Sequence, residues 1–230
     1  RESASEENLT KIKDNLKEKF ITILDNNYPS YFKNMCHPPL VLFYRGNIDL
    51  LSNNEPKIGI IGSRNSSNYG ENSIKKVVND FSKNYIIVSG LAKGIDAFSH
   101  ECALDNNLKT IAIIGSGFNN FYPKENYNLY KRIIENDGLV LTEYFPDVEP
   151  VAQNFVYRNR LIASISDFLL VGEAYSKSGT SITVSNALSM GKDIGCIPYE
   201  IGKENMCNTW IKQGAFLVES AKDIEEVIKK

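Results

Sequence analysis

The sequence predicts an α/β fold in which helices cover both faces of a doubly wound, mostly parallel sheet. After the segment Asn53–Pro56, short apolar runs alternate with stretches that have the periodicity of helices. Such alternation is typical of strands that are connected through helices and buried on both faces. Hydrophobic residues make up 42% of the 230 residues and charged residues 23%, which are ordinary values for a globular chain.

The expected elements follow one another as strand, helix, strand. We expect strands at Lys57–Ile61, Tyr85–Ser89, Thr110–Gly115, Gly138–Thr142, Asp167–Gly172, Asp193–Ile197 and Ala215–Val218. We expect helices at Gly70–Ser82, Ile95–Asn106, Asn126–Glu135, Asn159–Ser164, Ser181–Met190 and Met206–Gln213. A last helix is expected to begin after Ser220, whose hydroxyl can cap it together with Asp223.

The first 50 residues have a different character. Apolar residues recur at helical spacing through Glu7–Leu24, which predicts an amphipathic helix. The following segment is irregular and contains Pro38-Pro39 before a short apolar run at Leu40–Tyr44. We therefore expect a helical and irregular lead-in over residues 1–50 and the main α/β domain over residues 51–230.

Composition argues against membrane insertion and against a zinc site. No apolar run approaches the roughly 18–20 residues of a membrane span. The cysteines Cys36, Cys102, Cys196 and Cys207 have no CxxC spacing, so reduced thiols in a cytoplasmic protein are expected. The net charge of −2 means that a nucleic-acid site must concentrate its basic residues locally.

Glycines, hydroxyls and basic residues follow several of the predicted strands. The carboxyl ends of parallel strands meet at one edge of a sheet, where ligands bind in the crevice. Glycines allow tight turns there, and the first amides of a helix attract anions. The residues that we expect to line a phosphate-binding crevice are Gly62, Ser63, Arg64, Ser89, Gly90, Lys93, Gly94, Lys124, Asn126, Lys177, Ser178, Gly179 and Thr180.

The segment Phe155–Arg160 mixes aromatic rings with Arg158, Asn159 and Arg160 near a predicted helix start. Aromatic rings can stack on bases and guanidinium groups can hold phosphates, so these polar residues are also predicted to bind a strand. One alternative stays open, in which Arg158 and Arg160 tie the helix to neighbouring carbonyls. For Arg64, a surface ion pair is the alternative to a phosphate contact.

The motifs of nucleotide-using enzymes are absent from the sequence. No GxGxxG follows the first strand of the main domain, and GxxxxGK[ST] occurs nowhere. Asp96, Glu143 and Glu173 lie near strand ends, but no Ser–His or Cys–His pair accompanies them. His100 and Trp210 are interpreted as packing residues. We therefore predict binding without catalysis and without a cofactor or metal.

A series of short motifs resembles the DNA-processing protein A family, also called Smf. The motifs are IGIIGSR (58–64), SGLAKGID (89–96), FYPKEN (121–126), TEYFP (142–146), FVYRNRLIASIS (155–166), VGEAYSKSGTSIT (171–183), the dipeptide Ile197-Pro198, and IKQGA (211–215). With a similar lead-in at residues 28–47, the resemblance covers about residues 28–220. It implies an extended Rossmann-like domain that binds single-stranded DNA and forms a homodimer.

The resemblance also implies a biological role. Members of the family protect incoming single strands and help to load the RecA recombinase onto them during natural transformation. By motif, Arg64 and Lys124 contact the strand, together with backbone donors around Ser89-Gly90 and Ser178–Thr180. Tyr199 and Met206 stand where the family usually has glycine, which leaves the conformation of those two loops open.

Two other functions are kept as alternatives. A nucleotide phosphoribohydrolase uses a PGGxGTxxE loop, but the corresponding loop here, residues 177–183, has Thr183 in place of the working Glu. A pure interaction protein, with a vestigial crevice and a surface that recruits a recombinase, is the second alternative. Release of free base from AMP distinguishes the first alternative, and loss of strand binding distinguishes the second.

Overall fold

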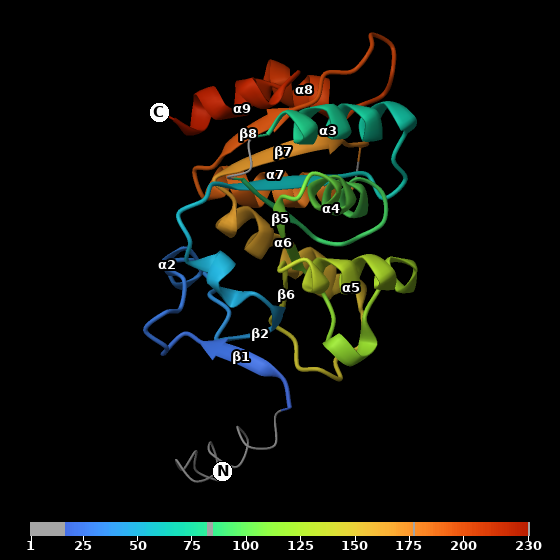
Figure 1. Ribbon diagram of the computed structural model, residues 1–230. Coiled ribbons are helices and arrows are strands. Elements are labelled where there is room, and N and C mark those ends of the chain that lie inside the picture. Colours follow the sequence, from blue (N-terminus) through green and yellow to red (C-terminus); the bar gives the residue numbers. More distant parts are fainter. Residues whose placement is uncertain (1–16, 82–84, 177, 230) are drawn as a thin grey trace.

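The computed structural model describes residues 17–81, 85–176 and 178–229. Within these residues, nine strands form one sheet in the order β1-β2-β6-β5-β4-β3-β7-β8-β9 (Figure 1). The strands are β1 (Lys19–Thr22), β2 (Val41–Gly46), β3 (Lys57–Gly62), β4 (Ile86–Ser89), β5 (Lys109–Ile113), β6 (Leu139–Thr142), β7 (Phe168–Glu173), β8 (Asp193–Cys196) and β9 (Phe216–Leu217). The pairings from β3 to β9 are parallel, whereas β1–β2 and β2–β6 are antiparallel.

The described residues form eight α-helices, most of which connect parallel strands. They are α2 (Ser30–Lys33), α3 (Asn68–Asp80), α4 (Ile95–Asp105), α5 (Tyr127–Glu135), α6 (Ala152–Ile165), α7 (Gly179–Ser189), α8 (Met206–Lys212) and α9 (Ala221–Ile228), with short 3₁₀ turns η1 (Ile48–Leu51), η2 (Phe118–Asn120) and η3 (Lys124–Asn126). The capping box of Ser220 and Asp223 is present at the start of α9, as predicted. Each strand predicted between residues 57 and 218 overlaps an observed one.

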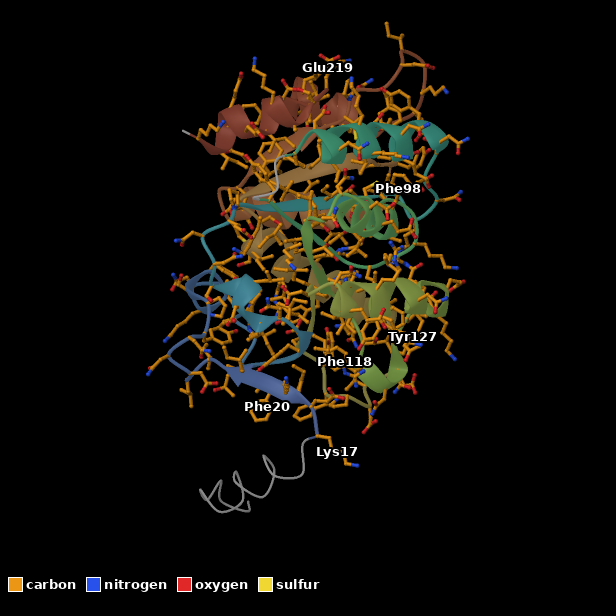
Figure 2. All side chains as sticks on the ribbon, viewed as in Figure 1. Lys17, Phe20, Phe98, Phe118, Tyr127 and Glu219 are labelled. Carbon is orange, nitrogen blue, oxygen red and sulfur yellow. The ribbon has the colours of Figure 1, made fainter. Side chains whose placement is uncertain are left out.

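The sheet is covered on both faces, which confirms the predicted fold class. Neighbouring residues of one strand point to opposite sides: Ile86 and Val88 pack into one apolar cluster, and Ile87 packs into another. Apolar residues of α6, α7 and α8 fill the first cluster, and those of α3, α4 and α9 fill the second. Figure 2 shows how side chains occupy the space between the layers, from Phe20 at the β1 edge to Glu219 near the β9 edge.

The predicted helix over Glu7–Leu24 is wrong for residues 19–22, which form β1; residues 1–16 lie outside the described residues. Along β1, Ile21 is buried and its neighbours are not, so tertiary pairing overrides the helical spacing of the sequence. β1 pairs with β2, and β2 joins the sheet through β6. The lead-in is therefore attached to the sheet, and the division of the chain at residue 50 stays a prediction.

The strand order reverses beside β3. The chain proceeds from β3 through β4 and β5 to β6 in one direction, and then continues from β7 to β9 on the opposite side of β3. The carboxyl ends of β3 and β7 therefore lie at a topological switch point, where open α/β sheets form their ligand crevice. No helix in the described part of the chain is long and apolar enough to cross a membrane.

Candidate nucleic-acid interface

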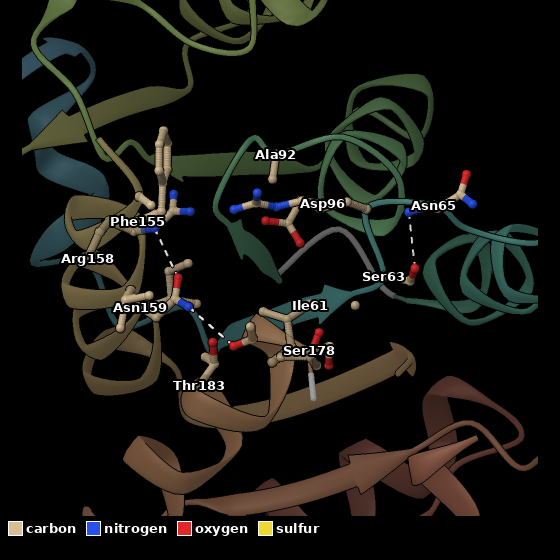
Figure 3. Close-up of a pocket in the computed structure, with 17 residues that line it drawn as sticks. Ile61, Ser63, Asn65, Ala92, Asp96, Phe155, Arg158, Asn159, Ser178 and Thr183 are labelled. Carbon is tan, nitrogen blue, oxygen red and sulfur yellow. Dashed lines mark hydrogen bonds between the residues drawn. The ribbon is translucent and has the colours of Figure 1, made fainter. Parts of the chain in front are cut away.

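A cleft of about 470 Å³ lies at the switch point. Its walls come from the loop after β3, the loop after β4, the first turns of α6, and the start of α7. Figure 3 shows Asp96 and Ala92 on one side of this cleft, with Ser178 and Thr183 on the other. Of the predicted site residues, the cleft brings together Gly62, Ser63, Arg64, Arg158, Asn159, Ser178, Gly179 and Thr180.

The loop after β3 presents Arg64 to the cleft. Ser63 is held beneath it, because its amide donates to the carbonyl oxygen of Glu173 at 2.8 Å and its hydroxyl accepts from the amide of Asn65 at 3.0 Å. The Arg64 guanidinium carbon lies 5.6 Å from the ring centre of Phe155, which is cation–π range. Arg64 is exposed and forms no ion pair within the described residues, so its guanidinium is available to a ligand.

The loop after β4 is already saturated with hydrogen bonds. Ser89 Oγ donates to the carbonyl oxygen of Ile60 at 2.6 Å and is fully buried. Gly90 donates its amide to Asp96 Oδ2 at 3.1 Å and accepts from Arg158 Nη1 at 2.6 Å. A Cβ at Gly90 would lie 2.6 Å from the guanidinium of Arg158 and the carboxylate of Asp96, so a larger residue would displace both groups. Ser89, Gly90, Asp96 and Arg158 thus form a hydrogen-bonded frame behind the cleft.

Two more predicted residues brace this loop from outside. Gly94 has φ of +73°, and a Cβ there would lie 2.2 Å from the carbonyl oxygen of Ser63. Asn126 donates to the carbonyl oxygens of Leu91 and Ala92 at 3.0 and 3.1 Å. Both residues fix the shape of the cleft wall, while neither lines the cleft itself.

Arg158 is buried at the base of the cleft, with 2% of its surface exposed. Its Nη1 donates to the carbonyl oxygens of Gly90 and Ile113, and its Nε donates to Asn159 Oδ1 at 3.2 Å. Burial lowers the pKa of Arg158 to about 10, with the charge of Asp96 acting in the opposite direction. Arg158 therefore stays charged at neutral pH. Its Nη1 and Nε donate to groups of the protein itself.

Arg160 is also buried, but it points away from the cleft. It forms a bidentate ion pair with Glu143, with two N–O distances of 2.6 Å, and its guanidinium lies 3.6 Å from the ring centre of Tyr157. Its Nε donates to the carbonyl oxygen of His37 at 3.3 Å. This arrangement corresponds to the structural alternative for Arg160, whereas a DNA contact by Arg158 or Arg160 stays a prediction.

Lys93 and Lys124, which the sequence predicts to bind phosphate, lie beside the cleft. Lys93 pairs with Glu125 at 2.5 Å, and both side chains are exposed, so the pair contributes little stability. Lys124, on η3, is exposed and forms no ion pair in the described ranges. The neighbouring Tyr122 is 45% exposed and lies 5.7 Å from the ring centre of Phe155. Aromatic rings therefore connect the loop of Lys124 with the cleft.

The start of α7 forms the remaining wall. Ser178 occupies the N-cap position, and Gly179 is exposed with open space around its Cα. Asn159 Nδ2 donates to the carbonyl oxygen of Gly179 at 3.5 Å and joins this wall to α6. Lys177 lies outside the described residues, so its predicted contact stays a prediction.

The carboxylates near the strand ends have different surroundings. Glu173 is fully buried and accepts from the amide and hydroxyl of Ser67 and from the Tyr175 hydroxyl, so it holds the start of α3. Asp96 lines the cleft, and burial raises its pKa against the opposing charge of Arg158. His100 is buried elsewhere, with Nδ1 2.6 Å from Thr110 Oγ1. These residues form no nucleophile–base pair within the described part of the chain.

Side chains hold the turn at Tyr199, one of the two loops that lack the expected glycine, whereas the amide of Met206 in the other loop donates to the carbonyl oxygen of Ala174 at 2.8 Å. Asn208 accepts from the amide of Tyr199 at 2.9 Å and donates to its carbonyl oxygen at 2.8 Å. The Tyr199 hydroxyl donates to the carbonyl oxygen of Gly172 at 3.0 Å. An amide and an aromatic side chain thus fix this turn in place of glycine.

Sequence reasoning left several cleft residues unassigned, among them Ala92, Ala152 and Ile162. These side chains carry no polar group, so no chemical signal marks them. Thr183 also lines the cleft, one helical turn after Gly179, and helical spacing from the Ser178–Thr180 motif is the signal that could have found it.

The fold and the cleft define a class of protein: a Rossmann-like α/β domain with a cleft at its topological switch point. The sequence model of the family described as DNA recombination-mediator protein A matches residues 19–229, so the chain belongs to this family. DNA processing protein DprA of Streptococcus pneumoniae is 43% identical over 205 residues, which are 88% of this chain and 72% of that protein. The Bacillus subtilis DprA is 36% identical, with 90% and 70% coverage.

Solved structures agree with this assignment. The crystal structure of the S. pneumoniae DprA superposes with a TM-score of 0.88 at 40% identity, and covers 95% of this chain and 77% of that one. A Helicobacter pylori structure superposes with a TM-score of 0.82 at 26% identity, with 93% and 96% coverage. That structure gives insight into the single-stranded DNA binding mode of DNA processing protein A from H. pylori.

Proposed function

We propose that the protein binds single-stranded DNA in the switch-point cleft, without cutting or modifying it, as part of DNA processing in natural transformation. The observation that carries this proposal is the pairing of an unengaged guanidinium, Arg64, with the amino end of α7 in the same cleft. Both attract phosphate groups. Family membership and the DNA-binding H. pylori relative support the same conclusion.

The chemistry of the cleft suits a strand of any base sequence. Phosphates interact with Arg64 and Lys124, while the exposed ring of Tyr122 and the adjacent Phe155 offer faces on which bases stack. Contacts of this kind read the backbone and the flat faces of the bases, so they carry little sequence information. The net charge of −2 is compatible with this function because Arg64 in the cleft and Lys124 beside it supply positive charge locally.

A phosphoribohydrolase activity receives no support from the cleft. Thr183 lies in the cleft where that class of enzyme places its glutamate, and a threonine hydroxyl supplies no carboxylate for work on a glycosidic bond. We therefore keep the binding function, without catalysis, as the proposal. Release of free adenine from AMP by the purified protein would overturn it.

We further propose that the protein acts in the cytoplasm as a homodimer that helps to load RecA onto the bound strand. The β9 edge supports the dimer: β9 pairs with β8 alone within the described residues, and Phe216 and Leu217 are exposed there. We expect Leu217→Lys to shift the protein from dimer to monomer in analytical ultracentrifugation. The RecA and cytoplasmic assignments rest on family membership.

The first experiment is fluorescence anisotropy with a labelled oligo-dT of about 30 nucleotides and with its duplex counterpart, at two salt concentrations. The proposal predicts tighter binding of the single strand and an affinity that falls as salt rises, because phosphate contacts release counterions. Absence of binding at low salt would contradict the proposal.

A further inference from the structure

Donors other than Arg64 are concentrated at the start of α7. Ser178 precedes this 11-residue helix, and the amides of Gly179 and Thr180 open it. The first amides of a helix have no acceptor within the helix and therefore attract anions. Thr180 and Thr183 follow on the wall of the cleft, where Figure 3 shows Thr183 close to Asn159 and Ser178 farther along the same helix start.

The three hydroxyls of this wall form no hydrogen bond with the residues that the structure describes. Ser178 Oγ is buried without a hydrogen bond. Thr180 and Thr183 are 6% and 2% exposed, and neither hydroxyl forms a hydrogen bond with the described ranges of the chain. A buried hydroxyl without a partner, as at Ser178, is unfavourable unless a ligand supplies the missing hydrogen bond. Hydroxyls gathered in this way on one wall point to a ligand with several acceptor oxygens.

We propose that this wall binds a phosphate monoester, which is the terminal phosphate of a DNA strand or the phosphate of a free mononucleotide. A phosphodiester within a strand has two unbridged oxygens and a single charge, whereas a monoester has three strong acceptor oxygens and about −1.5 to −2 charges at pH 7. The hydroxyls of Ser178, Thr180 and Thr183, the α7 amides and Arg64 supply enough donors for three oxygens. The inference rests on the proposed DNA-binding function and adds a preference for strand ends.

The charges of the cleft favour the dianion. Arg64 and Arg158 outnumber Asp96 among the charged residues that line it in the described part of the chain. The second pKa of a phosphate monoester is about 6. We therefore expect the preference for the monoester to increase between about pH 5.5 and 7.5, as the second proton leaves the phosphate. A purely structural role of the α7 hydroxyls would produce no such pH dependence.

The test compares three labelled oligo-dT strands of about 10 nucleotides in anisotropy titrations: 5′-phosphorylated, 3′-phosphorylated and without a terminal phosphate. Free dTMP and thymidine are titrated separately by calorimetry. We expect at least about fivefold tighter binding of a phosphorylated strand, or of dTMP over thymidine, because ionic hydrogen bonds are gained. A gain by one strand alone identifies that strand end as the source, and a gain by dTMP alone identifies the mononucleotide.

Variants connect the effect to α7. Thr183→Val keeps the shape of the side chain and removes its hydroxyl, so it is expected to reduce the ratio between phosphorylated and unphosphorylated ligands. Ser181→Ala, on the same helix but off the cleft wall, is the matched control and is expected to keep the ratio.

The outcomes separate this inference from the proposed function. If the unphosphorylated strand binds but no monoester binds better, the inference is overturned and the DNA-binding proposal stands. If no strand binds, the DNA-binding proposal fails, and the comparison of dTMP with thymidine still decides whether the wall holds a monoester. Equal binding of dTMP and thymidine in that case overturns the inference as well.

Discussion

Two pairs of basic residues that the sequence predicts alike to bind DNA differ in their surroundings, since one pair is buried and the other is exposed. Arg158 and Arg160 are buried on α6, and their donors are engaged by backbone carbonyls and by Glu143. Arg64 and Lys124 are exposed on loops and form no ion pair in the part of the chain that the structure describes. The first pair is engaged within the fold, and the second pair has donors that we propose bind the DNA strand.

This difference has a physical cause. A charge can be buried only where hydrogen bonds and counter-charges replace water, so a buried arginine has few donors left for DNA. An exposed cation has lost no hydration, and it gains from a phosphate through counterion release. Exposure and free donors, rather than the presence of an arginine in a motif, therefore separate contact residues from positioning residues.

The largest expected effect is on stability, when the ion pair between Arg160 and Glu143 is broken. Arg160→Met leaves Glu143 buried without its bidentate partner, and removal of one member of a buried ion pair costs about 3–5 kcal/mol of the free energy of unfolding. Urea unfolding followed by circular dichroism measures it. Arg132→Met, which removes an exposed pair with Asp105, is the control and is expected to cost less than about 1 kcal/mol. Equal losses in the two variants would contradict a stabilising role of the Arg160–Glu143 pair.

The second prediction uses His100, which lies in the buried part of the molecule. Burial, and then the charge of Arg158, lower the pKa of His100 to about 3. Below pH about 6.5, His100 binds a proton in the unfolded chain and stays neutral in the folded protein. The free energy of unfolding therefore falls as the pH decreases from about 6.5 toward 3. The contribution of His100 to this slope approaches about 1.4 kcal/mol per pH unit.

Urea midpoints at pH 7 and pH 5 measure this slope. His100→Gln is expected to flatten it, whereas His37→Gln, at the exposed second histidine, is expected to leave it as in the parent protein. A slope that persists in His100→Gln would assign the acid sensitivity to other groups.

The third prediction concerns the free pair. Arg64→Ala is expected to weaken oligo-dT binding about tenfold and to reduce the slope of log affinity against log salt by about 1, because one phosphate contact is lost. Lys124→Ala is expected to have a smaller effect on affinity, since Lys124 lies outside the cleft. Both variants should keep the free energy of unfolding within about 0.5 kcal/mol. Sequence-selective losses would contradict a backbone contact.

The smallest effect is expected at Gly179. A Cβ there meets no atom within 4 Å, and alanine favours a helix by up to about 1 kcal/mol relative to glycine, so Gly179→Ala should not destabilise the protein. The added methyl group lies at the start of α7, where we propose that a phosphate approaches the helix amides, and a few-fold loss of affinity is expected. A variant that is more stable and binds normally would place the phosphate elsewhere.

Most of the fold could be predicted from the sequence, because buried parallel strands are continuous apolar runs such as Ile58–Ile61. β1 could not, since its residues share the spacing of a helix and only pairing with β2 selects the strand. The sequence predicts the start of α6 at Asn159, whereas the helix begins seven residues earlier, at Ala152. Its segment Phe155–Tyr157 is rich in aromatic and β-branched residues, which favour strands outside this tertiary context.

The candidate site was predictable at the level of loops and not at the level of side chains. Motif position indicates that a residue lies near the switch point, as it does for Arg64 and Ser178. It carries no information on whether a guanidinium points into the core, as in Arg158, or whether one turn of helix brings Thr183 to the cleft wall. Both depend on packing between elements that are distant in sequence.

The measurement that tests the central claim most directly is the affinity of the Arg64→Ala/Lys124→Ala double variant for labelled oligo-dT, compared with the parent protein at one low salt concentration. If the free cations hold the strand, the two losses add because the residues are separate, and the affinity falls by more than tenfold while the urea midpoint stays in place. An affinity equal to that of the parent protein would contradict the account and place the DNA on another surface.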